Sequence, residues 1–264
     1  MKLKTAAARR VQKIASTVAR QSRSLPSNPI TPDSFSAGVV DNPKCELPDA
    51  VRIIIVDDHP LFRHGLTQLL NSDDGFCVCG EATNSGEALT LVRKLKPHLV
   101  IIDLSLKGPN GLELTKSLRT EFPKLPVLIL SLHDEPTYAV RSLRAGANGY
   151  VTKQDALGSV LIAVREVMNG RVYLSPSMAS EVIANVVLTK REGGASPTDN
   201  LSDRELEILE RLGKGEEVKT IARSLHISPK TVETHRAHIK EKLNLPNARQ
   251  VTRYAVQWVS ARGV

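Results

Sequence analysis

Two spacings of apolar residues alternate along residues 52–168. Short apolar runs, which are typical of buried β-strands, are separated by stretches in which apolar residues recur every three or four positions, as on one face of an α-helix. The expected strands are 52–56, 76–82, 99–103, 127–131 and 149–151. The expected helices are 61–70, 86–95, 112–122, 138–145 and 157–168. This strand-then-helix alternation predicts an α/β domain with a doubly wound, five-stranded parallel sheet.

Only the helical spacing continues beyond residue 200. Ser202 is followed three positions later by Glu205, which is the pattern of a capping box at the start of a helix. Residues 218–225 form a second expected helix, and a third begins with Ser228 as N-cap and Pro229 in its first turn. With a fourth expected helix at 248–258, the pattern predicts a small all-α domain.

The segment between the two domains has turn-forming residues. Gly193, Gly194, Ser196 and Pro197 interrupt the periodicity within residues 190–200, which indicates a flexible linker. A length of 264 residues also suits two domains, at about 150 residues each. The expected parts are an N-terminal extension 1–50, an α/β domain 51–170, a linker 171–198 and a helical domain 199–264.

The N-terminal extension is basic and then rich in serine and proline. No acidic residue precedes Asp33, and the composition predicts a disordered basic arm. Val11, Ile14 and Val18 have helical spacing, so a membrane-surface or targeting helix stays open as an alternative, as does a true translation start near Val51. No apolar run approaches the roughly 18 residues of a membrane span, which predicts a cytoplasmic protein without one.

The net charge of +8 is unevenly distributed. Basic and acidic side chains are nearly balanced in residues 51–175, whereas residues 223–264 have a large basic excess. Because basic side chains on phosphates release condensed counterions, a local basic excess favours a nucleic-acid partner.

The three cysteines are interpreted as core residues. Cys77 and Cys79 lie on one face of an expected strand, and Cys45 lies in the extension. A zinc or redox site would need further ligands at suitable spacing, and the sequence has none.

Polar side chains occur where the expected strands end. Asp57 and Asp58 end the first strand, Asp103 ends the third, Ser131 ends the fourth, and Lys153 follows the fifth. Because the carboxyl ends of parallel strands meet at one edge, these side chains should lie together. Clustered carboxylates repel unless a cation neutralises them, and oxygen ligands suit Mg²⁺.

This cluster has the composition of a phosphoryl-transfer site. The Asp103 carboxylate can attack a phosphoryl group while Mg²⁺ and the Lys153 ammonium neutralise the transferring oxygens. Ser131 can then donate a hydrogen bond to the aspartyl phosphate, with Tyr150 following its movement. The chemistry predicts a two-state switch.

Four segments of this domain resemble the motifs of response-regulator receiver domains: 56–60 (VDDHP), 103–105 (DLS), Ser131 and 149–153 (GYVTK). The resemblance covers about residues 52–170. It implies that Asp103 is phosphorylated, that Asp58, Asp103 and the Ser105 carbonyl bind Mg²⁺ with support from Asp57, and that Ser131, Tyr150 and Lys153 have switch roles. Lys107 departs from the pattern, which usually has proline there; Pro109 follows shortly after.

The third C-terminal helix has an apolar and a polar face. Val232, Ile239 and Leu243 should pack inward, which leaves small, polar and basic residues free to enter a major groove. Residues 221–243 resemble the LuxR-type helix-turn-helix, and both domains together resemble the NarL/FixJ class. His226 departs from the usual glycine in the turn and must accept a positive φ.

The resemblance implies specific DNA contacts. Base-edge contacts are expected from Glu233, Thr234 and Ala237. The phosphate-contact candidates are Lys219, Lys230, Thr231, Arg236, Lys240 and Lys242. The fourth helix has Val251, Tyr254, Ala255 and Trp258 on one stripe, which is interpreted as core packing. By the same resemblance, this helix also forms a homodimer contact on paired half-sites.

The resulting prediction is a transcriptional regulator of a two-component system. A sensor histidine kinase phosphorylates Asp103, and phosphorylation promotes dimerisation and binding to promoter DNA, with RNA polymerase as a further candidate partner. No enzymatic activity is expected beyond promotion of its own phosphorylation and dephosphorylation.

Two alternatives remain at this point. An aspartate-nucleophile phosphohydrolase usually needs a second acid two residues after the nucleophile, where this chain has Ser105. A constitutive DNA-binding protein would use the α/β domain only for protein interaction and would not incorporate phosphate. A nicotinamide-binding enzyme fits less well, since no glycine-rich fingerprint follows the first strand.

Overall fold

The computed structural model describes residues 38–106, 110–132, 136–191 and 197–261. The expectations for residues 1–37, for Lys107 and Pro109, and for the glycine-rich part of the linker lie outside these ranges. Residues 37–264 form one unit, and only this unit is described below.

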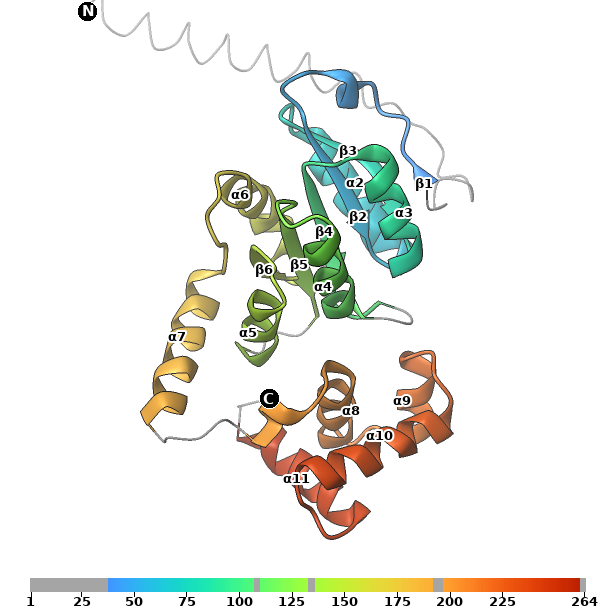
Figure 1. The fold of residues 1–264 in the computed structure, drawn as a ribbon, viewed down its shortest axis with the longest axis vertical. Coiled ribbons are helices and arrows are strands. Elements are labelled where there is room, and N and C mark those ends of the chain that lie inside the picture. The colour runs from blue at the N-terminus through green and yellow to red at the C-terminus, as the bar shows by residue number, and fades with distance from the viewer. Residues whose placement is uncertain (1–37, 107–109, 133–135, 192–196, 262–264) are drawn as a thin grey trace, which may run out of the picture. The chain divides into compact units, whose positions relative to one another are not determined.

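A six-stranded sheet forms the centre of the first domain (Figure 1). The strands β2 (Val51–Val56), β3 (Phe76–Ala82), β4 (Leu99–Asp103), β5 (Val127–Ser131) and β6 (Gly149–Thr152) are parallel and lie in the order β3-β2-β4-β5-β6. This arrangement confirms the doubly wound α/β fold. The strand number differs, because β1 (Gly38–Val39) pairs antiparallel with β3 and adds a sixth strand.

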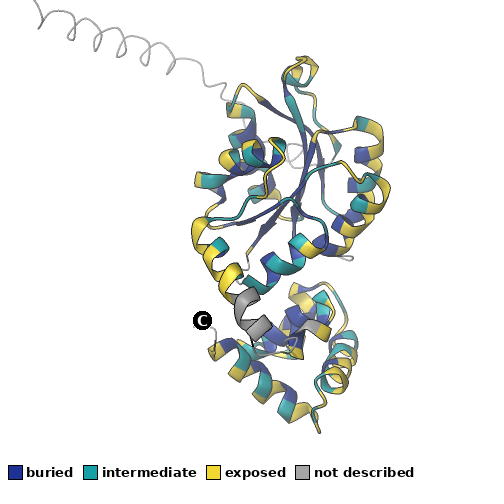
Figure 2. Cartoon of the chain, turned by 60° about the vertical axis from the view of Figure 1, so that its left-hand side comes forward, coloured by how far each residue is buried: buried dark blue, intermediate teal, exposed yellow. Residues whose placement is uncertain are grey.

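Helices cover both faces of the sheet because apolar residues on each strand alternate between the two faces. Ile53 and Ile55 of β2 pack with residues of α2 (Pro60–Ser72) and α6 (Ala156–Met168). Ile54 and Val56 face the opposite way, into the core that includes α3 (Ser85–Leu95), α4 (Gly111–Glu121) and α5 (Pro136–Arg144). Figure 2 shows buried strands with helices whose outer faces are exposed.

Helix α7 (Pro176–Arg191) occupies much of the segment expected to be a linker. The sequence predicted no helix within the linker 171–198, and the structure has one over these sixteen residues. Met178 is buried in the core that includes α3, α4 and α5, but Ile183 is 63% exposed. Because apolar side chains are spread around α7, the sequence lacks the one-sided stripe by which a helix is recognised. A short 3₁₀ helix, η3 (Pro197–Asn200), follows.

Four helices form the C-terminal domain: α8 (Asp203–Gly213), α9 (Val218–Ser224), α10 (Pro229–Lys242) and α11 (Ala248–Ser260). Ser202 and Glu205 make the expected capping box, and Ser228 caps α10 through Thr231 N. Gly213 is required for close packing, because a Cβ there would lie 2.5 Å from the carbonyl oxygen of Ala255 on α11. His226 adopts the positive φ expected of it, at 52°.

Residues 38–50 differ from the expectation of a disordered extension. They contain β1 and a 3₁₀ helix, η2 (Pro43–Glu46), and Ala50 is buried. Cys77 and Cys79 are buried core residues, as expected, but Cys45 is only half-buried and forms a disulfide with Cys77. The interpretation of the cysteines as buried core residues is therefore confirmed for Cys77 and Cys79 and wrong for Cys45. Among the described residues, no helix is long and apolar enough to cross a membrane.

Candidate functional site

The acidic residues predicted from the strand ends form one cluster. Asp57 and Asp58 follow β2, Asp103 ends the neighbouring strand β4, and carboxylate oxygens of all three lie within 4.8 Å of one another and of a His59 ring nitrogen. Asp57 and Asp103 are only 1% and 2% exposed. The sheet topology thus brings three carboxylates to a single edge, as the sequence predicted.

Lys153 supplies the compensating positive charge. Its Nζ lies 2.7 Å from Oδ2 of Asp103 and 2.7 Å from Oδ2 of Asp57, and it is positioned 4.6 Å from the ring centroid of Phe62. Burial alone would lower the pKa of Lys153, but the charges of Asp103 and Asp57 outweigh it and raise the pKa. Lys153 is therefore a fixed cation between two carboxylates.

His59 is a site residue that the sequence argument did not single out. Its Nδ1 lies 2.9 Å from Asp58 Oδ1, 3.2 Å from Asp57 Oδ1 and 3.6 Å from Asp103 Oδ2. The hydrogen bond to Asp103 is the main cause that raises the pKa of His59. Its place directly after the two aspartates was the only sequence signal.

The pKa values of Asp57 and Asp103 shift in opposite directions. Burial and the charge of Asp103 raise the pKa of Asp57. Burial also acts to raise the pKa of Asp103, but hydrogen bonds from His59 and Lys153 and the lysine charge lower it overall. Asp103 is therefore the carboxyl most strongly held as an anion, the state needed for a nucleophile.

Two residues outside the motifs hold this edge in place. Arg63 of α2 is 1% exposed; it donates to the backbone oxygen of Asp57 at 2.8 Å and to Glu81 Oε2 at 2.8 Å. Gly111 at the start of α4 lies against Asp103, since a Cβ there would be 2.3 Å from the Asp103 carbonyl oxygen. Both contacts fix the backbone that carries the carboxylates.

The remaining predicted receiver residues surround the cluster. Ser131 is fully buried at the end of β5, and its carbonyl accepts a 2.6 Å hydrogen bond from Lys153 N. Tyr150 on β6 is 1% exposed. Ser105 N donates to Asp103 Oδ1 at 3.1 Å, which holds the loop after β4 close to the carboxylate. Ser105 and Ser131 therefore lie at strand ends beside the cluster, whereas Tyr150 lies two residues before the end of β6, opposite Ile129 of β5.

The donor set fits a magnesium ion. The three carboxylates provide hard oxygen ligands close to one another. Burial and then repulsion from Asp103 raise the pKa of Asp57, and a divalent cation would relieve this repulsion. The Ser105 backbone lies beside Asp103 and can add a carbonyl oxygen. The acidic cluster is therefore suited to this metal by its chemistry.

The predicted DNA-contacting residues lie on the surface of the C-terminal domain. Glu233, Thr234 and Ala237 are exposed on α10, while Val232 and Ile239 are buried on its other side. Lys219 and Lys230 are exposed, and Thr231, Arg236 and Lys240 are partly exposed. This distribution leaves one polar face of α10 accessible.

Several of these candidates have partners within the protein, Lys242, Arg236 and Glu233 among them. Lys242 is exposed, but its Nζ lies 2.7 Å from Glu205 Oε2 and so connects the end of α10 to the start of α8. Arg236 NH1 donates to Glu233 Oε1 at 2.7 Å on the same helix. A contact from Lys242 to DNA would have to compete with its ion pair.

Helix α5 of the first domain contacts the segment that begins the second. The Tyr138 hydroxyl donates to Glu210 Oε2 at 2.7 Å, and both side chains are buried. Arg141 donates to Asp203 Oδ1 at 2.8 Å, to the Leu201 carbonyl at 2.9 Å and to the Thr198 carbonyl at 2.7 Å. The sequence argument missed these contacts, because no motif connects positions so far apart.

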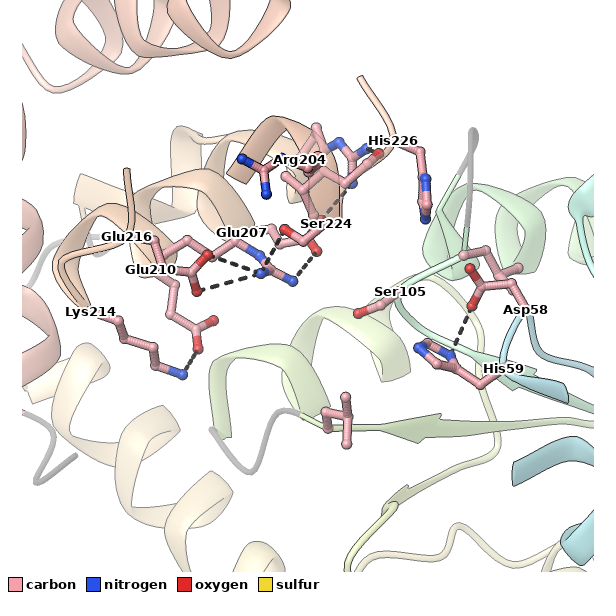
Figure 3. A pocket seen from close by; sticks show the side chains of 15 residues that line it. Asp58, His59, Ser105, Arg204, Glu207, Glu210, Lys214, Glu216, Ser224 and His226 are labelled. Atoms are coloured by element: carbon pink, nitrogen blue, oxygen red, sulfur yellow. Dashed lines mark hydrogen bonds and ion pairs between the residues drawn. The ribbon is translucent and has the colours of Figure 1, made fainter. Parts of the chain in front are cut away.

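The acidic edge also lines a pocket of about 440 Å³ (Figure 3). Asp58, His59 and Ser105 lie on one side of it. Residues of α8, α9 and the turn after α9, including Arg204, Glu207 and His226, line the rest. Asp58 of the carboxylate cluster and residues of the helix-turn-helix segment therefore line one cavity.

Comparisons with known families identify both domains. Residues 53–165 match the family described as response regulator receiver domain, and residues 199–255 match the family described as bacterial regulatory proteins, luxR family. Response regulator GacA of Pseudomonas protegens is 36% identical over 207 residues, which cover 78% of this chain and 96% of GacA. Oxygen regulatory protein NreC of Staphylococcus haemolyticus is 36% identical over 211 residues, covering 78% and 97%.

Solved structures agree with this assignment. One of them is RcsB of Salmonella enterica serovar Typhimurium, bound to the promoter rprA in the presence of the phosphomimetic BeF₃⁻. It aligns with a TM-score of 0.51 and 26% identity, and the alignment covers 78% of this chain and 98% of RcsB. A LuxR-family two-component response regulator from Aurantimonas aligns with a TM-score of 0.51 and 36% identity over 52% of this chain and 99% of its own.

The chain belongs to the response regulators that join a receiver domain to a LuxR-type DNA-binding domain, the NarL/FixJ class. It is a DNA-binding regulator of a two-component system, and phosphorylation-dependent control is the mechanism of its family.

Proposed function

We propose that a sensor histidine kinase transfers a phosphoryl group to Asp103, and that the phosphorylated protein binds promoter DNA more tightly, as a homodimer, in the cytoplasm. The observation that carries this proposal is the position of the Lys153 ammonium, 2.7 Å from oxygens of both Asp103 and Asp57. A buried carboxylate held as an anion beside a fixed cation is suited to phosphoryl transfer.

The chemistry follows from the charges in the pocket. An Asp103 oxygen attacks phosphorus as the bond to the kinase histidine nitrogen breaks, and Lys153 neutralises charge on the phosphoryl oxygens. Asp57, Asp58, Asp103 and the Ser105 carbonyl would hold Mg²⁺, which when bound screens the carboxylates and stabilises the transferring phosphoryl group. The protein acts on no further substrate in this account; it promotes only its own phosphorylation and dephosphorylation.

Helix α5 transmits the conformational change from the phosphorylated site to the DNA-binding domain. After phosphorylation the Ser131 hydroxyl donates to a phosphoryl oxygen, which moves the end of β5 and the helix that follows, and Tyr150 repacks with it. Because α5 carries Tyr138 and Arg141, its displacement breaks their hydrogen bonds to Glu210 and Asp203. Loss of these contacts releases the DNA-binding domain.

The released domain binds DNA through α10. Its exposed face places Glu233, Thr234 and Ala237 at base edges, and the basic residues around them contact phosphates. The exposed side of α11, which carries Val256 and lies opposite the buried Val251 and Ala255, provides the homodimer contact that aligns two domains on paired half-sites. Bound to a promoter, the dimer is positioned to contact RNA polymerase.

Phosphoryl incorporation tests the proposed acceptor. The full chain is incubated with acetyl phosphate and Mg²⁺, reduced with borohydride to mark the acyl phosphate, and mapped by peptide mass spectrometry. We expect modification at Asp103 and none in Asp103→Asn or in wild type with excess chelator. Asp74→Asn, at an exposed surface carboxylate, serves as the matched control. Equal labelling of Asp103→Asn would overturn the proposal.

A further inference from the structure

A covalent bond joins the segment before the receiver domain to the sheet. Cys45 in η2 is bonded to Cys77 on β3, with Cα atoms 5.3 Å apart, inside the range of about 4.4–6.8 Å that a disulfide requires. Cys77 is fully buried, whereas Cys45 is half-buried. The bond therefore connects a segment at the surface to the core, through a half-buried cysteine in the segment and a fully buried cysteine in the sheet.

The other contacts of this segment are a short strand pairing, a few hydrogen bonds and the packing of Val40 and Ala50 against the core. Strand β1 adds two residues to the edge of β3, and Val40 N donates to the Cys79 carbonyl at 3.0 Å. Lys44 Nζ donates to the Asn71 carbonyl at 3.0 Å and lies 3.1 Å from the fully exposed carboxylate of Asp74. Exposed ion pairs of this kind contribute little stability. The disulfide is thus the strongest connection between residues 38–50 and the sheet.

The receiver core does not depend on this connection. The receiver family match begins at residue 53, so Cys45 and the segment around it lie outside it. The buried residues of β2 that build the core, Ile53 to Val56, pack against helices on both faces. Opening the disulfide therefore frees residues 38–50 and leaves the sheet and its acidic edge folded.

The third cysteine is a poor competitor for this pair. Cys79 lies two residues from Cys77 on the same strand, and its thiol donates to the Ile53 carbonyl at 3.4 Å. The Cα atom of Cys77, in contrast, lies 5.3 Å from that of Cys45, within the range of a disulfide. Oxidation should therefore select Cys45 and Cys77.

We propose that Cys45 and Cys77 form a reversible, redox-sensitive disulfide that fastens residues 38–50 over the edge strand β3 in the oxidised state and releases them in the reduced state. The reversible role rests on the cytoplasmic location in the proposed function, because disulfides in that compartment are usually transient and regulatory. The oxidant is a small-molecule disulfide of the glutathione type.

The exchange is balanced in two steps. The Cys45 thiolate attacks one sulfur of the oxidant, forms a mixed disulfide and expels one thiolate. The Cys77 sulfur then attacks the Cys45 sulfur, forms the protein disulfide and expels the second thiolate. Two protein thiols are oxidised, one oxidant disulfide is reduced to two thiols, and the two thiol protons leave with them.

The test uses the full chain in glutathione buffers of graded redox ratio, without phosphodonor or DNA. Free thiols are alkylated and mapped by mass spectrometry, and hydrogen exchange is followed in peptides that cover residues 38–50. We expect oxidation to protect Cys45 and Cys77 from alkylation, to leave Cys79 free, and to slow exchange in this segment by about tenfold or more.

Serine variants distinguish the role of the Cys45–Cys77 disulfide from that of Cys79. Cys45→Ser should abolish the redox dependence of exchange, whereas Cys79→Ser should respond as wild type does. Cys45→Ser is chosen because its side chain is only half-buried, and circular dichroism verifies that it is folded. Three outcomes would overturn the proposal: a disulfide that includes Cys79, three free thiols in fully oxidising buffer, or equal hydrogen exchange of residues 38–50 in both states. None of these readouts depends on phosphorylation, so either proposal can fail alone.

Discussion

The Tyr138 hydroxyl donates a 2.7 Å hydrogen bond to Glu210 across 72 residues of sequence, and Glu210 is 1% exposed. A buried hydrogen bond to a charged group contributes about 1.5–3 kcal/mol. The bond connects α5, which follows the strand ending at Ser131, to α8 of the DNA-binding domain. The two halves of the proposed switch are therefore in direct contact.

Removal of this contact should activate the unphosphorylated protein. With Tyr138→Phe or Arg141→Ala, the population of released domain rises, and the affinity for a target duplex should increase by about tenfold or more without phosphodonor. Fluorescence anisotropy with a duplex selected in vitro measures the change. Arg144→Ala, on the same helix but exposed, is the matched control and should bind as wild type does. Unchanged affinity in both α5 variants would exclude this contact as the restraint.

Gly111 should tolerate no side chain. A Cβ at this position would lie 2.3 Å from the Asp103 carbonyl oxygen, so Gly111→Ala must displace α4 or the end of β4. We expect a loss of about 1–3 kcal/mol of stability, together with slower phosphorylation. In contrast, Gly158→Ala on α6 meets no atom within 4 Å and should be neutral or slightly stabilising. Denaturant unfolding and phosphorylation rates test the pair; equal stability of the two variants would contradict the packing described here.

The buried Arg63 should be essential to the fold of the receiver domain. Arg63→Met leaves Glu81 as an uncompensated buried carboxylate and removes the donor to the Asp57 carbonyl, which should cost about 3–5 kcal/mol. Arg93→Met, which breaks the exposed ion pair with Glu121, should have little effect by comparison. Thermal unfolding compares both with wild type. A small loss in Arg63→Met would show that the pair is not needed to hold the acidic edge.

The C-terminal domain should lose stability in acid through Glu205. Burial acts to raise the pKa of this carboxyl, but hydrogen bonds from Lys242 and the Ser202 backbone lower it below its ordinary value of 4.5. Its ionised form therefore stabilises the folded state above pH 4.5, and this contribution is lost as the pH falls through the lower folded pKa.

The matched variant for this effect is Glu205→Gln. Its melting temperature should fall less than that of wild type between neutral and acid pH, and Lys242→Met should also reduce the pH dependence. Calorimetry across this range measures the effect. Parallel pH profiles for wild type and Glu205→Gln would contradict the assignment of this carboxyl.

The receiver fold and its acidic cluster were predictable for a simple physical reason. Short apolar runs such as 53–56 that alternate with helical spacing are typical of buried parallel strands, and parallel strands bring their carboxyl ends to one edge. The positions of Asp57, Asp58 and Asp103 follow from these two facts. Because clustered carboxylates repel one another, the sequence also predicts that a cation such as Mg²⁺ binds there.

Other features depend on side-chain packing that local patterns do not encode. Strand β1 has two residues, too few for a period to be recognised. Arg63 has the sequence character of a surface residue, yet its partner Glu81 lies on β3. His59 could have pointed to solvent, and the contact of Tyr138 with Glu210 requires the tertiary arrangement of both helices. A disulfide likewise needs Cα positions that sequence alone does not supply.

The most direct test of the account is the DNA affinity of wild type and Asp103→Asn, each measured with and without acetyl phosphate in Mg²⁺ buffer. The account predicts that the phosphodonor tightens binding of wild type and leaves Asp103→Asn unchanged. The same increase in both proteins, or no increase in wild type that has been phosphorylated at Asp103, would contradict it.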